Sequence, residues 1–175
     1  KKKIKNILYL GQITPRKGIL YLLEAFESLN LKNVNLFIAG PAQKEMKKYL
    51  IDYCERNKNI QYFGRVSLAE KNKLFKKSDI FCLPTLEDGF AKVIIEAIEY
   101  QNYLLVSKFS AGPDIVNKDK NIGLIFDPKN KIDFKKKIKK SLNSEINLKN
   151  SKINLINIKY NWFNISRDFL NKLNR

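Results

Sequence analysis

A glycine-bracketed turn near the start of the chain carries two adjacent cations. Gly11 and Gly18 enclose the sequence GQITPRKG, in which Arg16 and Lys17 directly precede an expected helix. Cations oppose the dipole of a helix N-terminus, whereas an anion is favoured there by the dipole and by unpaired amide groups. The turn is therefore a candidate phosphate site, and a solvent-facing turn with two exposed charges is the alternative.

A second turn, with the sequence PTLEDGFAK over residues 84–92, joins two carboxylates to the start of another helix. Glu87 and Asp88 stand beside Gly89. The helix expected to follow would offer the backbone amides of its first turn, at Phe90, Ala91 and Lys92, to a ligand. A pyrophosphate could lie on these amides while a carboxylate accepts hydrogen bonds from sugar hydroxyls. An acidic loop that only caps the helix is the alternative, because Asp is favourable at that end.

A carboxylate inside an apolar run and a third glycine turn add to this set. Glu96 lies within the helix-forming sequence KVIIEAIE. A carboxylate among apolar residues needs a partner or a ligand. In the sequence FGRVS, residues 63–67, Gly64 lets the backbone approach a flat group, and Arg65 could face an anion or stack on a ring. Read by itself, this third segment is explained more simply as an ordinary strand-to-helix turn.

The elements that must position these turns alternate between strand and helix. Short apolar runs predict strands over residues 6–10, 34–39, 60–63, 79–84, 103–107 and 123–126. Amphipathic patterns predict helices over residues 18–29, 43–56, 67–77, 92–99, 132–142 and about 160–174, with a helical turn over residues 112–116. This alternation predicts an α/β fold, a Rossmann-like open parallel sheet of about six strands with helices on both faces. Ligands bind such sheets at the carboxyl ends of the strands, where all three turns lie.

The composition excludes several kinds of chemistry. The 175 residues include no histidine, so histidine acid–base catalysis and most zinc sites are excluded. The two cysteines, Cys54 and Cys82, are expected as reduced thiols in a helix and a buried strand. The net charge of +17 would attract polyanions. A genome biased toward lysine codons would produce the same charge without such a partner, so the charge alone selects no partner. No apolar run approaches the ~18 residues that a membrane-spanning helix needs.

In order and spacing, these segments resemble the C-terminal domain of family-four GT-B retaining glycosyltransferases. That family has a turn ending in Lys-Gly, a strand ending in Phe-Gly, and a Glu-Gly-Phe-Gly turn with Glu-Ala further on. The corresponding segments here are GQITPRKG, FGRVS and EDGFAKVIIEA, and KFSAGPDIVNKDKNIGLIFDP resembles the Gly-rich stretch that follows. Asp88 and Glu96 match the family's paired carboxylates, and Trp162 matches the aromatic residue before its last helix. The resemblance covers nearly the whole chain.

This resemblance implies a role for each turn. Lys17 would bind the donor diphosphate, Asp88 would hold hydroxyls of the donor sugar, and Glu96 would hold the ribose hydroxyls. The amides that receive the phosphates would be those of Gly89, Phe90, Ala91, Lys92 and Val93. The base pocket would be lined by Gly64, Arg65 and Val66, and the donor site would be completed by Gly11, Gln12, Arg16 and Glu87. Lys17 and Asp88 would be the catalytic residues, with no cofactor and no metal required in this half.

Four departures from the family pattern matter. Gly112-Pro113-Asp114 takes the place of a Gly-Gly…Glu turn, and the other three affect the donor site directly. Gln12 stands where the family has a phosphate-binding Arg, so Arg16 could supply that charge. Asp88 replaces a Glu and is one methylene shorter, which leaves its neighbour Glu87 as the alternative acid. Ala91 replaces a Gly and narrows the freedom of the backbone where a phosphate should approach.

The same resemblance predicts that residues 1–175 form one nucleotide-sugar-binding domain, with the N-terminal acceptor-binding domain absent from the chain. The implied reaction transfers a sugar, with retention, to a glycan, lipid-linked or polysaccharide acceptor. The expected location is the cytoplasm and the inner face of the cytoplasmic membrane. The lysine-rich residues 132–142 fit contact with an anionic membrane, and a packed helix with a solvated lysine face is the alternative.

Other functions fit the same features less well. A GT-B-type sugar-nucleotide epimerase would also bind a nucleoside diphosphate here, but the sequence DGFAKVIIEA favours a transferase. The first turn lacks Gly-x-Gly-x-x-Gly, which disfavours a dinucleotide-dependent oxidoreductase. A non-catalytic nucleotide-binding domain and a basic nucleic-acid-binding domain remain as alternatives, with nucleic acid the less favoured partner.

Overall fold

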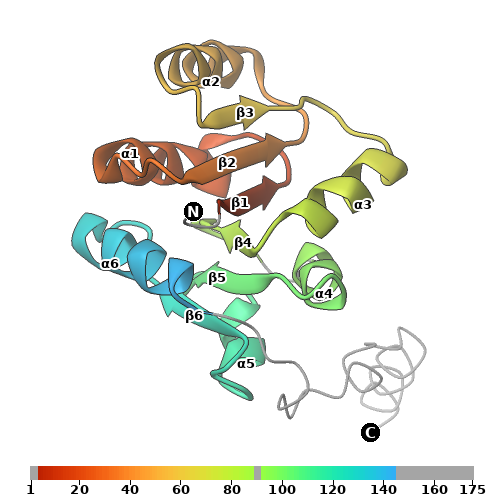
Figure 1. Ribbon diagram of the computed structural model, residues 1–175, viewed down its shortest axis with the longest axis vertical. Helices are drawn as coiled ribbons and strands as arrows, with labels where there is room; N and C mark the ends of the chain where they lie inside the picture. Colours follow the sequence, from red (N-terminus) through yellow and green to blue (C-terminus); the bar gives the residue numbers. More distant parts are fainter. Residues whose placement is uncertain (1–3, 89–91, 145–175) are drawn as a thin grey trace, which may run out of the picture.

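Six parallel strands form the centre of the protein and alternate with helices along the chain (Figure 1). The computed structural model describes residues 4–88 and 92–144. The strands are β1 (Lys5–Leu10), β2 (Val34–Ala39), β3 (Ile60–Tyr62), β4 (Ile80–Leu83), β5 (Tyr103–Ser107) and β6 (Gly123–Phe126). They are ordered β3-β2-β1-β4-β5-β6, and every neighbouring pair is parallel. The predicted α/β class and all six predicted strands are confirmed, with ends that differ by at most one residue.

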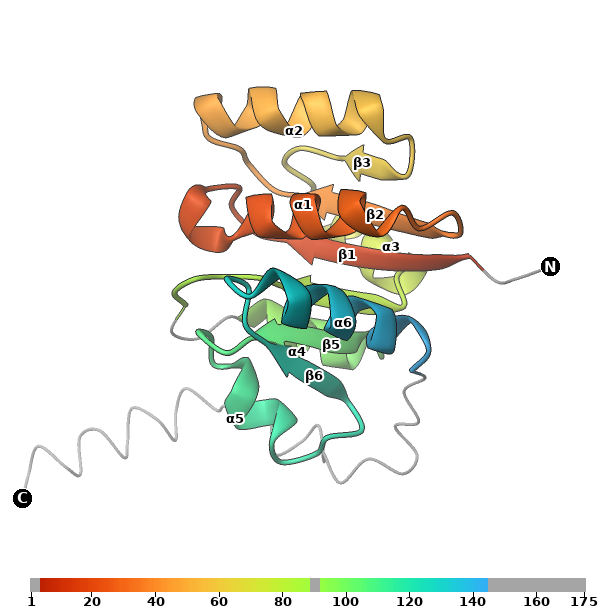
Figure 2. The same cartoon turned by 90° about the vertical axis from the view of Figure 1, so that its left-hand side faces the viewer.

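Helices cover both faces of this sheet (Figures 1 and 2). One face is covered by α1 (Ile19–Leu29), α2 (Lys44–Arg56) and α6 (Lys131–Leu142), whose apolar side chains share one core. The opposite face is covered by α3 (Leu68–Lys77), α4 (Lys92–Glu99) and α5 (Gly112–Val116), which share a second core. The expected terminal helix at about 160–174, with Trp162, lies outside the described residues.

The strand sequences explain why the sheet is covered on both sides. Along β1, Ile7 and Tyr9 are buried in the core beneath α1, while Leu8 is buried in the core beneath α3 and α4. Successive strand residues point to opposite faces, so a strand buried on both faces is a continuous apolar run rather than an alternating one. The strand β5 is such a run, and all five of its residues are buried.

Local signals set the helix ends that matter for the site. The N-cap Ser67 and Glu70 form the predicted capping box at the start of α3. Hydrogen bonds donated by the Ser67 amide and hydroxyl lower the pKa of the Glu70 carboxyl. The helix predicted from residue 18 begins instead at Ile19, because Pro15–Lys17 form a short 3-10 turn (η1) and Gly18 adopts a left-handed φ of 69°.

The two cysteines are free thiols, as expected. Cys82 is buried in β4 and Cys54 is partly buried in α2, and burial raises the pKa of both thiols. Across the described residues, no helix has the length and apolar character required to span a bilayer.

The strand order places a crevice at one edge of the sheet. The central strands β1 and β4 are neighbours, with Ile7 opposite Ile80 and Leu8 opposite Phe81. The chain leaves β1 toward α1 on one face of the sheet and leaves β4 toward α4 on the other. Where connections diverge in this way, the carboxyl ends of the two strands border an opening in which open α/β sheets bind their ligands.

Candidate functional site

A pocket of about 330 Å³ opens where β1 and β4 end. It is built by the turn after β1, the η1 turn, the loop after β4 and the first residues of α4. The predicted site residues that line it are Gly11, Gln12, Arg16, Lys17, Asp88, Lys92 and Val93. Two turns that are about seventy positions apart in the sequence are therefore brought together, as the predicted phosphate site requires.

Lys17 and Asp88, the two predicted catalytic residues, form an ion pair across this pocket. The Lys17 Nζ atom lies 2.5 Å from Asp88 Oδ2, and the two side chains are 18% and 15% exposed. Glu87, the alternative acid, has an exposed side chain and does not line the pocket. Of the two neighbouring acids, Asp88 is thus the one that faces Lys17.

Backbone contacts hold the two turns against each other. The Leu86 amide donates a hydrogen bond of 2.9 Å to the carbonyl of Arg16. At Gly18 the backbones approach so closely that an added Cβ would lie 1.9 Å from the carbonyl oxygen of Pro84. Only a glycine can occupy this position without moving the loop after β4, which explains why a glycine follows Lys17.

The loop after β4 is also braced from within and from β5. The buried Thr85 hydroxyl donates a hydrogen bond of 2.9 Å to the carbonyl of Glu87. The Asp88 amide donates one of 3.2 Å to the carbonyl of Phe109, in the loop that follows β5. These bonds fix the backbone that carries the Asp88 carboxylate toward Lys17.

Tyr9 is a residue of the pocket that the sequence patterns did not single out. Its fully buried ring lies in β1, and its hydroxyl donates a 2.6 Å hydrogen bond to the carbonyl of Gln12. Burial, with smaller effects from Cys82 and Asp88, raises the pKa of the Tyr9 hydroxyl well above its usual range. The hydroxyl is therefore a neutral donor that fixes the turn after β1. A hydroxyl-bearing aromatic at the end of a buried strand was the available signal.

Glu96 lies one helical turn beyond Val93 on α4 and does not line this pocket. Its carboxylate pairs with Lys71 of α3, with 2.7 Å between Lys71 Nζ and Glu96 Oε1. The expectation that a carboxylate in this apolar run needs a partner is therefore met, by a lysine that the patterns did not identify.

The turn after β3 stands apart from the Lys17–Asp88 pocket. Gly64 has a φ of 65°, and its carbonyl accepts a 2.7 Å hydrogen bond from the Gly40 amide. Arg65 is exposed, and Val66 lines a different pocket, of about 280 Å³, together with Phe37 and Phe63. The strand order explains the separation, because β2 lies between β3 and β1.

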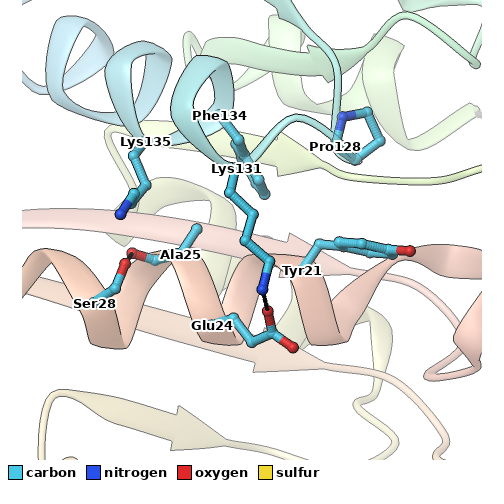
Figure 3. Close-up of a pocket in the computed structure, with 8 residues that line it drawn as sticks. All are labelled: Tyr21, Glu24, Ala25, Ser28, Pro128, Lys131, Phe134 and Lys135. Atoms are coloured by element: carbon cyan, nitrogen blue, oxygen red, sulfur yellow. Dashed lines mark hydrogen bonds and ion pairs between the residues drawn. The ribbon is translucent and has the colours of Figure 1, made fainter.

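Two of the predicted phosphate-binding residues, Lys92 and Val93, begin α4 and line the Lys17–Asp88 pocket. Gly89, Phe90 and Ala91 lie outside the described residues, so of the predicted phosphate-binding amides only Lys92 and Val93 are placed, at the start of α4. Within residues 4–88 and 92–144, no three His, Cys, Asp or Glu side chains are grouped to hold a metal ion. A smaller pocket of about 110 Å³ lies between α1 and α6 and involves none of the predicted site residues (Figure 3).

Solved structures identify the class of fold. The glycosyltransferase WaaG, which is involved in lipopolysaccharide biosynthesis, superposes with a TM-score of 0.68 at 21% sequence identity. The match covers 82% of this chain and 39% of WaaG. The six-stranded parallel sheet with helices on both faces is thus a Rossmann-like fold of the kind found in GT-B glycosyltransferases.

Sequence comparison identifies the family. The model of the family described as "Glycosyl transferases group 1" matches residues 1–161, and the chain therefore belongs to this family. An uncharacterised glycosyltransferase of Methanocaldococcus jannaschii, MJ1607, is 32% identical over 72% of this chain and 33% of its own length. A Campylobacter jejuni relative, named as an undecaprenol-linked glycan α-1,4-N-acetyl-D-galactosaminyltransferase, is 26% identical over 82% of this chain and 40% of its own length. The chain thus spans about a third to two fifths of the relatives it matches.

Proposed function

We propose that this chain binds the nucleoside diphosphate sugar donor of a retaining glycosyltransferase, which transfers the sugar to a glycan, lipid-linked or polysaccharide acceptor. The observation that carries the proposal is the Lys17–Asp88 pair in a pocket at the carboxyl ends of β1 and β4. The pair offers a cation for a diphosphate and, in direct contact with it, a carboxylate for sugar hydroxyls. The membership in group 1 of the glycosyl transferases supports the same reading.

The chemistry asked of these residues is stabilisation of a leaving group. When the bond between sugar and diphosphate breaks, negative charge builds on the departing diphosphate. Lys17, which pairs with Asp88, and Arg16 are cations that line the pocket, and the first amides of α4 point toward the helix N-terminus. Fixed charges and dipoles that face developing charge lower the barrier without reorganising during the reaction. This role requires neither a histidine nor a metal from this half of the enzyme.

The acceptor and the second half of the active site belong to the proposal as well. The printed names of the relatives include an undecaprenol-linked glycan transferase and two capsular polysaccharide glycosyltransferases, which supports an acceptor of that kind. Donor and acceptor meet between two domains in GT-B enzymes. We therefore expect residues 1–175, tested on their own, to bind donor, and we expect appreciable transfer only when an acceptor-binding domain is also present.

Nucleotide binding by the isolated chain tests the proposal. Thermal shift and calorimetry would compare UDP, GDP and ADP with their sugars, for the wild type and for Lys17→Ala and Glu96→Ala. We expect one nucleotide to stabilise the wild type, and each substitution to weaken its binding about tenfold or more, as expected for charge-assisted hydrogen bonds. The absence of stabilisation by all of these ligands, together with salt-sensitive binding of DNA, would instead identify a nucleic-acid-binding domain.

A further inference from the structure

An ion pair between α3 and α4 lies outside the Lys17–Asp88 pocket and is not explained by diphosphate binding. Lys71 Nζ lies 2.7 Å from Glu96 Oε1, and the two side chains are 22% and 34% exposed. The other lysines of α3, Lys73, Lys76 and Lys77, are exposed to solvent. Lys71 is thus the one lysine of this helix that turns inward, and it turns toward a carboxylate.

The local sequence shows that the pair is held in place. Glu96 emerges between Ile95 and Ala97 on a helix whose inner residues Ile94, Ala97 and Ile98 are buried. A carboxylate on such a helix is costly to shield from water unless a cation or a hydrogen-bond donor meets it. Lys71 meets this requirement from the neighbouring helix on the same face of the sheet (Figure 1).

The position of the pair relates it to the donor site. Lys71 lies one turn beyond the N-cap Ser67, and its own amide donates to the Ser67 carbonyl at 2.9 Å. The segment Gly64–Val66, which would line the base pocket, directly precedes that cap. Glu96 lies one turn beyond Val93, which lines the diphosphate pocket. Residues three or four apart share one side of a helix, so the ion pair bridges the two segments between which a nucleoside would lie.

We propose that Lys71 is a positioning residue, which holds the Glu96 carboxylate in place to receive the ribose hydroxyls of the donor. The proposal rests on the donor-binding function proposed above. A carboxylate has about four acceptor positions, so the Lys71 amine occupies one and leaves others for two neighbouring hydroxyls. Holding the carboxylate in advance removes the entropic cost of ordering a glutamate side chain when the nucleotide binds.

The test measures how much the ribose 2′-hydroxyl contributes to the affinity of the protein for a nucleotide. Calorimetry would compare the tightest binder among UDP, GDP and ADP with its 2′-deoxy form, and pyrophosphate would serve as the ligand without ribose. The variants are Lys71→Met, Lys71→Arg, Glu96→Gln and the double variant Lys71→Met/Glu96→Gln. Lys76→Met, on the same helix with the same loss of charge, is the matched control.

The expected result is specific to the ribose. In the wild type the 2′-deoxy form binds about tenfold more weakly, as expected for a hydrogen bond to a charged acceptor. Lys71→Met reduces this ratio to less than about twofold, leaves pyrophosphate binding unchanged and adds no further loss to Glu96→Gln. Lys71→Arg keeps most of the ratio, and Lys76→Met keeps all of it.

Two outcomes overturn the proposal in distinguishable ways. If the wild type binds nucleotide through Lys17 but Lys71→Met keeps the full ratio and only lowers the melting temperature, the ion pair is structural and the donor site stands. If the wild type binds none of the nucleotides, the donor-binding function fails and the role of Lys71 fails with it.

Discussion

At the scale of single residues, Lys17 and Asp88 are partners that would meet different parts of one donor. The carboxylate lies 2.5 Å from the amine, so its negative charge opposes a diphosphate that approaches the same cation. The Asp88 carboxylate would favour donor binding only through hydrogen bonds that it accepts from the sugar hydroxyls. Removing the charge of Asp88 should therefore strengthen the binding of the diphosphate and weaken the contribution of the sugar to donor affinity.

Asp88→Asn tests this opposition directly. Asn keeps the shape of Asp but removes the charge, so we expect nucleoside diphosphate to bind about fivefold more tightly, the effect of one charge interaction of about 1 kcal/mol. The additional affinity that the attached sugar confers should fall, because an amide is a weaker acceptor than a carboxylate. Calorimetry with a nucleoside diphosphate and its sugar measures both effects. Glu87→Gln is the matched control, since this neighbouring acid has an exposed side chain and does not line the pocket. Weaker diphosphate binding by Asp88→Asn would contradict the assigned roles.

At the scale of elements, the close approach of two turns at Gly18 holds the site together. Gly18 and Gly64 have nearly the same left-handed φ, 69° and 65°. At Gly18 an added Cβ would meet the carbonyl oxygen of Pro84 at 1.9 Å, whereas at Gly64 it would meet no atom within 4 Å. The two glycines therefore share the same backbone requirement and differ in the space around them.

Substitution by alanine separates these two requirements. Gly64→Ala carries the cost of a left-handed alanine, about 1 kcal/mol in the free energy of unfolding. Gly18→Ala carries the same cost and must also push the loop after β4 away from η1. We expect it to lose several kcal/mol and to weaken nucleotide binding, since Lys17 and Asp88 separate. Urea unfolding and thermal shift with nucleotide measure the two effects. Equal losses for both variants would show that the contact with Pro84 has no energetic weight.

The elements differ in how far the sequence predicts them. The strands and the cap of α3 are set by local signals, namely short apolar runs and the pair Ser67 and Glu70, and these predictions are confirmed within one residue. The start of α1 is shifted because Pro15–Lys17 form a 3-10 turn, a choice that depends on how Gly18 packs against the loop after β4.

The assembly of the site depends on contacts that no local pattern encodes. The turns after β1 and β4 meet because these strands are neighbours, while the turn after β3 lies two strands from β1. The family resemblance places all three turns in one donor site, and the structure adds that Val66 lines a pocket other than the one between Lys17 and Asp88. Lys71 was one lysine among many in the sequence, and only the packing of α3 beside α4 shows that it faces Glu96.

At the scale of the whole molecule, the net charge of +17 is unevenly distributed over the helices. The sequence of α2, KEMKKYLIDYCER, mixes its lysines with three acids, whereas that of α6, KIDFKKKIKKSL, has six lysines and one aspartate. Lys131 of α6 pairs with Glu24 of α1 at 2.9 Å (Figure 3). Beyond it, Lys136, Lys139 and Lys140 are exposed, and so is Ile132, with 79% of its surface accessible. A cationic stripe with an apolar residue at one end suits a surface of anionic lipid.

Vesicle binding tests whether α6 or the net charge alone is responsible for such contact. The substitution of Lys136, Lys139 and Lys140 by Gln removes three charges from α6 and keeps good helix formers. At about 1 kcal/mol for each lysine near an anionic surface, we expect it to weaken binding to phosphatidylglycerol-containing vesicles about a hundredfold at 0.1 M salt. Replacing Lys44, Lys47 and Lys48 of α2 by Gln removes the same charge from a different helix on the same face of the sheet (Figure 2). We expect this control to weaken vesicle binding much less, because its lysines are not part of the α6 stripe. Equal losses for the two triple variants would assign the attraction to net charge, and preferential binding to DNA over the vesicles would assign it to nucleic acid.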